Sequence, residues 1–174
     1  MFVSPYSHPD VVAGAGTIAL EILAERRDID TLVVPMGGGG LIGGIGIAAQ
    51  ESGAAVIGVE VEASCPFTQS LAAGRIVPIE VGPTLADGLA GNLDPDTITF
   101  DLVRRFVERI VVVSEGQLRT ATGDLLREER LVVEGAGAAG AAALRSDALD
   151  LGGQQVAIVL TGANIDPGKL RELL

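Results

Sequence analysis

The sequence predicts an α/β fold: a three-layer, open and mainly parallel sheet with helices on both faces. Short apolar runs alternate with segments in which apolar residues recur every three or four positions, as strands alternate with helices. The apolar runs are continuous instead of alternating with polar residues, which is typical of strands that helices cover on both faces. The segments between them are long enough for the crossovers that parallel neighbours require.

The first half of the chain begins with the pattern of a helix start. Ser7 is followed three residues later by Asp10, as in a capping pair. Apolar residues then recur on one helical face as far as Leu23. The other elements expected up to residue 85 are a strand over 31–36, a helix over 41–51, a strand over 55–61, a short helix over 65–71 and a loop over 74–85.

The second half repeats this alternation. Ser114 and Gln117 form another capping pair, which opens a helix that we expect to reach Arg130. The stretch 135–144 consists almost entirely of Gly and Ala, which predicts a helix packed closely against a neighbour. The remaining expected elements are a helix over 99–107, a strand over 110–113 and a last strand over 156–160.

Length and charge limit the classes of protein to consider. With 174 residues the chain has room for one domain with a core, so we expect residues 1–174 to form a single domain. The formal net charge is −11, from 12 basic and 23 acidic side chains. Basic residues gather in nothing larger than pairs such as Arg26-Arg27, so the chain would repel a phosphate backbone. We therefore expect no nucleic-acid partner.

The cysteine count and the apolar runs predict the compartment. Cys65 is the only cysteine, so the chain cannot form an internal disulfide, and a reducing cytoplasm is the default. The apolar runs are broken by Gly, Pro or charge well short of the roughly 20 residues that a spanning helix needs. The first residues also lack the pattern of a signal peptide. These observations predict a cytoplasmic protein without a membrane partner.

Four consecutive glycines, residues 37–40, follow an expected strand and precede an expected helix. Glycines leave their N–H groups unshielded and can adopt positive φ. At a helix N-terminus such groups form a nest for an anion, helped by the helix dipole, and a phosphate group fits this nest best. A tight turn without a ligand is the simpler explanation, but one or two glycines would be enough for that.

The identity of the phosphate ligand is open from the pattern alone. No Gly-Lys-Ser/Thr follows, which excludes a Walker-type nucleotide loop. Gly38, Gly40 and Gly43 do fit the dinucleotide fingerprint G-x-G-x-x-G, with Glu60 about where a ribose-binding acid would lie. An NAD-binding domain is therefore one alternative. A non-catalytic protein that uses the glycine loop for a phosphate ligand is another.

Six segments together resemble the serine/threonine dehydratases and serine racemases, which are fold-type-II pyridoxal-phosphate enzymes. Their order and spacing are compatible with that family over nearly the whole chain. The resemblance implies the carboxyl-terminal portion of the large domain, the part that binds the cofactor phosphate. The segments are YSHPDVVAGAGTIALEI (Tyr6 to Ile22), VVPMGGGGLIGGI (Val33 to Ile45), VIGVE (Val56 to Glu60), TLADGLA (Thr84 to Ala90), LVVEGAGAAG (Leu131 to Gly140) and VLTGANID (Val159 to Asp166).

The resemblance implies a site for pyridoxal phosphate. Thr161 matches the hydroxyl residue that hydrogen-bonds the pyridine nitrogen, and Gly88 and Glu134 would lie near the ring. Some members bind a divalent cation through an acid that matches Glu60, but a second acid of that site is Pro66 here, so we expect no metal. The backbone N–H groups implied to hold the phosphate are those of Gly37, Gly38, Gly39, Gly40 and Leu41.

The family lysine that binds the cofactor covalently lies in an amino-terminal Ser-x-Lys-x-Arg-Gly motif, which these 174 residues do not contain. Lys169 is the only lysine, and we expect it to be a solvated residue. We therefore predict no catalytic residue in this chain, the absence of the amino-terminal half, and a chain that is inactive alone. The implied parent reaction converts threonine or serine to a 2-oxo acid and ammonia. Exposed apolar surface would favour a homo-oligomer or pairing with the missing half.

Overall fold

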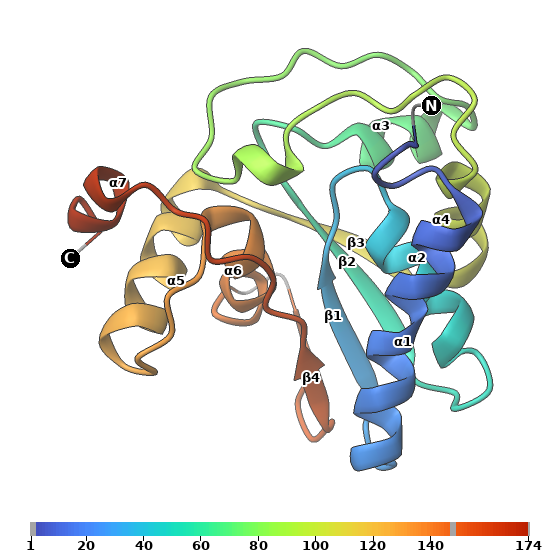
Figure 1. Ribbon diagram of the computed structural model, residues 1–174, viewed down its shortest axis with the longest axis horizontal. Helices are drawn as coiled ribbons and strands as arrows, with labels where there is room; N and C mark the ends of the chain where they lie inside the picture. Colours follow the sequence, from blue (N-terminus) through green and yellow to red (C-terminus); the bar gives the residue numbers. More distant parts are fainter. Residues whose placement is uncertain (1–2, 147–148, 174) are drawn as a thin grey trace.

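A computed structural model describes residues 3–146 and 149–173 (Figure 1). These residues form an α/β domain whose elements follow one another in the predicted alternation. In chain order the elements are α1 (Pro9–Glu25), β1 (Thr31–Pro35), α2 (Gly40–Ala49), β2 (Ala55–Val61), α3 (Pro66–Ala73), the short 3₁₀ helix η1 (Asp87–Leu89), α4 (Thr99–Phe106), β3 (Arg109–Val113), α5 (Glu115–Arg127), α6 (Gly135–Leu144), β4 (Val156–Ile158) and α7 (Pro167–Arg171).

The four strands form one parallel sheet in the order β3-β2-β1-β4. The central strand β1 pairs with β2, where Thr31 lies opposite Ala55, and with β4, where Thr31 lies opposite Val156. The strand β2 pairs in turn with β3. Because all pairs are parallel, the carboxyl ends of the strands lie along one edge of the sheet, and the connections that follow them meet there.

Helices cover both faces of this sheet (Figure 1). The side chains of Leu32 and Val34 point to a core shared with α1, α2 and α4, whereas Val33 joins a second core with α5 and α6. Successive side chains of one apolar strand therefore pack into cores on opposite faces of the sheet, as the sequence pattern predicted. The three-layer fold class is confirmed.

Most elements begin or end within a few residues of the predicted positions, and the start of α1 and the end of α5 are two of the differences. The cap of α1 is His8 and not Ser7: Nδ1 of His8 accepts a hydrogen bond from the Asp10 N–H (3.2 Å), while Oγ of Ser7 accepts one from the Ile98 N–H (3.1 Å). The helix α5 ends at Arg127, short of the predicted residue 130. The cap of α1 differs from the prediction because Ser7 makes a tertiary hydrogen bond with Ile98, which a local sequence pattern does not predict.

Other local predictions are confirmed. The capping box of α5 is present, with the Ser114 hydroxyl bonded to the Gln117 N–H and the Gln117 side chain bonded to the Ser114 N–H. The last strand is shorter than predicted, but the Val159 N–H still donates to the Val33 carbonyl (2.9 Å) beyond its end. Among the described residues, no helix combines the length and the apolar character needed to cross a bilayer.

Candidate functional site

The glycine run joins the end of β1 to the start of α2 at the carboxyl edge of the sheet. Gly39 is the N-cap of α2 and has φ +84°, a left-handed conformation that residues with a Cβ adopt rarely. The helix begins at Gly40. The predicted turn from strand into helix is therefore present, and its geometry requires glycine at its third residue.

Side chains from distant segments pack directly against the glycine run. A Cβ on Gly38 would overlap the ring of Tyr6, and one on Gly40 would lie 2.6 Å from the Tyr6 carbonyl oxygen. A Cβ on Gly39 would lie 2.5 Å from Cζ of Phe67 and 3.0 Å from Cβ of Thr99. The loop thus has no room for side chains, and its backbone is fixed from outside.

The N–H groups of this loop have no partner within the protein. From Gly37 to Ile42, six consecutive backbone N–H groups make no hydrogen bond to any acceptor in the described residues, and the first bond of this region runs from the Gly43 N–H to the Gly39 carbonyl (2.9 Å). Gly39, Gly40 and Ile42 are nevertheless buried. Buried N–H donors are costly when they are unpaired, so this arrangement fits an external acceptor.

The segment 84–90 lies beside the glycine run. A Cβ on Gly37 would lie 3.2 Å from Cα of Leu89 and 3.4 Å from the Gly88 carbonyl oxygen. Both carboxylate oxygens of Glu115, in the first turn of α5, accept hydrogen bonds from this segment: from the Thr84 hydroxyl (2.8 Å) and from the Leu85 N–H (2.8 Å). Glu115 therefore fixes the position of Gly88 next to the glycine run.

Glu134 connects Gly88 with the segment that follows β4. A Cβ on Gly88 would lie 3.5 Å from Oε1 of Glu134, while Oε2 of Glu134 accepts a hydrogen bond from the Asn164 N–H (3.1 Å). The Glu134 N–H donates to the carbonyl of Gly162 (3.1 Å), directly after Thr161. The predicted site residues on the three loops are therefore neighbours in space, although they span more than half of the chain.

A cavity of about 380 Å³ opens next to Glu134. Its wall includes Asp87 and Lys169, whose carboxylate oxygen and Nζ lie 3.4 Å apart. The prediction that Lys169 is solvent-exposed is correct, since about half of its side chain is accessible. Its place at the rim of this cavity was not foreseen.

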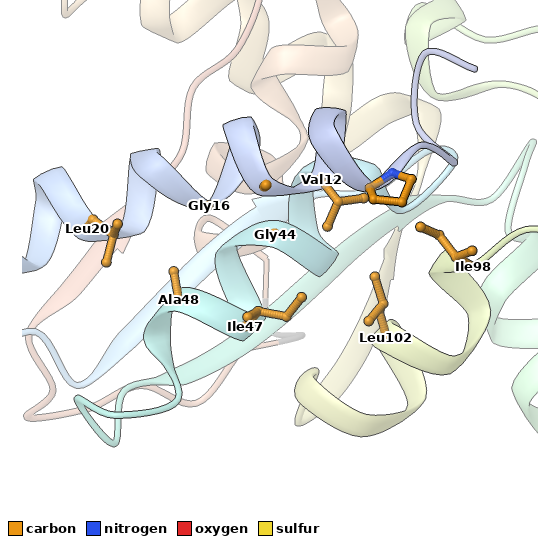
Figure 2. A pocket seen from close by; sticks show the side chains of 10 residues that line it. Val12, Gly16, Leu20, Gly44, Ile47, Ala48, Ile98 and Leu102 are labelled. Carbon is orange, nitrogen blue, oxygen red and sulfur yellow. The ribbon is translucent and has the colours of Figure 1, made fainter. Parts of the chain in front are cut away.

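A second cavity, of about 360 Å³, lies between α1, α2 and α4 (Figure 2). Its wall is almost entirely apolar and includes Val12, Leu20, Ile47 and Leu102. No side chain in this wall could hold a phosphate or a carboxylate. This apolar cavity is therefore separate from the glycine-loop site.

Glu60 lies at the end of β2 and is completely buried. Its carboxylate accepts hydrogen bonds from the N–H groups of Phe67 (2.8 Å) and Thr68 (2.9 Å) and from the Thr68 hydroxyl (2.6 Å). Burial raises the pKa of Glu60 above the usual 4.5, and these hydrogen bonds act in the opposite direction. Because both oxygens bind the first turn of α3, the geometry disfavours a ribose-binding role for this acid.

Pro66, which stands where the resemblance would place a second acid of a cation site, is the first residue of α3. Within the described residues, no three side chains of His, Cys, Asp and Glu lie close enough together to bind a metal ion.

Several residues of the site had no signal in the sequence. Tyr6, Phe67 and Thr99 form the outer wall of the glycine run, and Glu115 holds the segment that contains Gly88. Each of them acts through contacts with residues far away in the chain. Their roles follow from the fold and not from any spacing, although Glu115 stands directly after the predicted capping residue.

Comparisons with known proteins identify the family of the chain. The family model described as "Pyridoxal-phosphate dependent enzyme" matches residues 1–162. The L-threonine ammonia-lyase of Thermotoga maritima is 42% identical over 176 residues, which cover 100% of this chain and 43% of that protein. The catabolic L-threonine dehydratase of Escherichia coli is 38% identical over 177 residues, which cover 99% of this chain and 54% of that protein.

Solved structures agree as well. The structure of maize serine racemase superimposes with a TM-score of 0.90 at 32% identity, over 98% of this chain and 54% of that one. The chain thus spans about half the length of the relatives that it matches. The family model, the relatives and the fold confirm the resemblance that the motifs indicated. The chain belongs to the pyridoxal-phosphate-dependent enzymes of fold type II, within the threonine dehydratase and serine racemase family.

Proposed function

We propose that these 174 residues form the part of a threonine or serine ammonia-lyase that binds the phosphate of pyridoxal phosphate. The observation that carries the proposal is the run of six N–H groups from Gly37 to Ile42 without an acceptor in the described residues. They lie at the N-terminus of a ten-residue helix, whose dipole adds to their attraction for an anion. The proposed phosphate ligands are the N–H groups of Gly37, Gly38, Gly39, Gly40 and Leu41.

The remaining predicted residues have a consistent role in this proposal. Gly88 would lie near the cofactor ring, and a side chain at this position would press against Ala136 and Glu134. Thr161 would offer its hydroxyl to the ring nitrogen from the end of β4, a neutral partner that suits elimination better than transamination. Glu134 would hold the loop after Thr161 through its bond to the Asn164 N–H. When bound, pyridoxal phosphate supplies the electron sink for the reaction.

The activity of the whole protein is part of the same proposal. The parent reaction would remove the α-proton and the β-hydroxyl of threonine or serine and give a 2-oxo acid and ammonia. The relatives named ammonia-lyase and dehydratase support this class of reaction, and they are about twice as long as this chain. The lysine of the family motif would come from residues outside these 174, since the chain contains Lys169 alone.

The experiment is a titration of the purified chain with pyridoxal phosphate, followed by calorimetry and absorbance. Lys169→Arg serves as the control variant, because it removes the one lysine that could react with the aldehyde and keeps a positive charge opposite Asp87. We expect saturable binding of equal strength in both chains, without the absorbance of a covalent lysine adduct. The proposal would be refuted if the chain bound NAD saturably and did not bind pyridoxal phosphate. It would also be refuted if Lys169→Arg lost the binding of pyridoxal phosphate.

A further inference from the structure

Two buried threonines lie directly behind the glycine run, at the start of α4. Thr99 is completely buried, and its hydroxyl donates a hydrogen bond to the carbonyl of Gly38 (2.8 Å). The hydroxyls of Thr97 and Thr99 lie 2.7 Å apart, and the Thr99 N–H donates to the Thr97 hydroxyl (3.2 Å). A chain of hydrogen bonds therefore leads from Thr97 to the second glycine of the run.

The direction of these hydrogen bonds follows from the atoms involved. A carbonyl oxygen can only accept, so the single hydroxyl proton of Thr99 is used on Gly38. In the contact between the two hydroxyls, Thr97 must then be the donor and Thr99 the acceptor. This arrangement leaves the Gly38 carbonyl with a donor of fixed position on the side of α4.

Planarity of the peptide bond transmits this orientation to the next N–H group. In a trans peptide the carbonyl of Gly38 and the N–H of Gly39 point in opposite directions, and the described residues contain no cis peptide. Because Thr99 holds the carbonyl toward α4, the Gly39 N–H points away from α4. This N–H is one of the six without an acceptor in the described part of the chain.

We propose that Thr99 is a positioning residue, which orients the Gly38–Gly39 peptide so that the Gly39 N–H faces the bound phosphate. The inference rests on the proposed function of the glycine run. Peptides between two glycines rotate more easily than others, since no Cβ restricts φ and ψ on either side. A rotated peptide would present the carbonyl oxygen to the anion in place of the N–H. The Thr99 hydroxyl opposes this rotation.

The experiment compares variants with and without the hydroxyl group of Thr99 or of Thr97. Thr99→Val keeps the volume and removes the donor to Gly38, and Thr99→Ser keeps this donor. Thr97→Val also keeps this donor but removes both hydrogen bonds between Thr97 and Thr99. We expect Thr99→Val to weaken binding of pyridoxal phosphate and of inorganic phosphate roughly tenfold, in the range of one lost hydrogen bond to a charged group. Thr99→Ser should restore binding to within about twofold of the unchanged chain, on the same scale. Equal affinity for Thr99→Val and the unchanged chain would overturn the proposal.

A readout at the peptide itself separates positioning from general damage. In ¹H–¹⁵N spectra the Gly39 amide should shift strongly on addition of phosphate in the unchanged and Thr99→Ser chains, and weakly in Thr99→Val. The carbonyl ¹³C chemical shift of Gly38, recorded without ligand, should change in Thr99→Val and should keep the value of the unchanged chain in Thr99→Ser. Thr99→Ala, which also lacks the hydroxyl, replaces Thr99→Val if that variant does not fold.

The two proposals fail in different ways. If the unchanged chain binds neither pyridoxal phosphate nor phosphate, the proposed function fails, and the ligand-free ¹³C comparison still decides whether Thr99 orients the peptide. If the unchanged chain binds and Thr99→Val binds equally well, the positioning role alone fails. An unchanged Gly38 carbonyl shift in Thr99→Val would likewise refute the role of Thr99.

Discussion

The backbone of Gly137, in α6, lies against the carbonyl oxygen of Thr161, and a Cβ at Gly137 would overlap that oxygen. The helix therefore approaches the end of β4 as closely as a backbone allows. This approach places the loop that begins at Thr161 beside Glu134, the N-cap of the same helix. Any side chain at residue 137 must push the helix and this loop apart.

We accordingly predict that Gly137→Ala lowers the free energy of unfolding by about 3 kcal/mol, the upper end of the usual cost of overpacking, because its Cβ would meet a backbone atom. Gly14→Ala is the matched control, since Gly14 also lies inside a helix and a Cβ there would meet nothing within 4 Å. It should stabilise the chain by about 0.5–1 kcal/mol. Urea unfolding of the three chains is the measurement, and equal effects of the two substitutions would contradict the packing described for Gly137.

A second prediction concerns the left-handed glycine of the phosphate loop. Gly39→Ala should abolish saturable binding of pyridoxal phosphate, because its Cβ would displace Phe67 and strain the backbone at φ +84°. Gly53→Ala carries a similar backbone strain at φ +77° but meets nothing within 4 Å. Each should cost about 1–2 kcal/mol of stability from φ alone. Calorimetric titration should show normal binding for Gly53→Ala, and loss of binding in both variants would point to a general effect of instability.

The sequence predicted the layers of the fold and the place of the glycine loop because both depend on local patterns. Continuous apolar strands require covered faces, and Gly37 to Gly40 stand between a strand and a helix. What the pattern could not predict is which residues surround the loop. Tyr6 and Thr99 reach it from segments on either side in the chain, and only the packed sheet brings them there. The cap of α1 was mispredicted for the same reason, since Ser7 bonds to Ile98.

The raised pKa of Glu60 gives a prediction about pH. Its folded-state pKa lies above the unfolded value, so its contribution to stability is complete below about pH 4.5 and is lost as the pH rises through the folded-state pKa. The free energy of unfolding of the unchanged chain, relative to Glu60→Gln, should therefore fall with rising pH in this window, by at most about 1.4 kcal/mol per pH unit. Glu62→Gln, which removes an exposed carboxylate nearby, is the control. A relative stability that rises with pH would show that the hydrogen bonds to Phe67 and Thr68 outweigh burial.

A fourth prediction concerns turnover. The 174-residue chain, supplied with pyridoxal phosphate and threonine or serine, should form no 2-oxo acid above the rate of free cofactor. Addition of the separately produced amino-terminal part of the Thermotoga maritima relative, which would contribute the family lysine, should restore measurable formation of 2-oxo acid. Robust turnover by the chain alone would refute the proposed dependence on residues outside it. If the chain binds pyridoxal phosphate but forms no 2-oxo acid even after this addition, a non-catalytic role would be favoured.

A fifth prediction concerns association. Leu20, Ile47 and Ile98 are each at least 40% exposed and line the apolar cavity between α1, α2 and α4. Exposed apolar surface of this kind favours burial between molecules. We expect the sedimentation coefficient of the chain to rise with its concentration. A coefficient that stays at the monomer value over the whole range would contradict self-association.

The position of β4 in the sheet has a consequence for the order of events during synthesis on the ribosome. The strand β1 can pair with β2 as soon as β2 is made, but the other edge of β1 cannot pair with β4 until β4 has been synthesised. The two ends that meet there are Asp30 and Gln155, which are 125 residues apart and bonded by the Gln155 N–H to a carboxylate oxygen of Asp30 (2.7 Å). Loop closure over such a distance is slow, and an open strand edge can pair with other chains in the meantime. The nascent polypeptide therefore presents this edge of β1 until β4 emerges, and this edge is where a chaperone would protect it from aggregation.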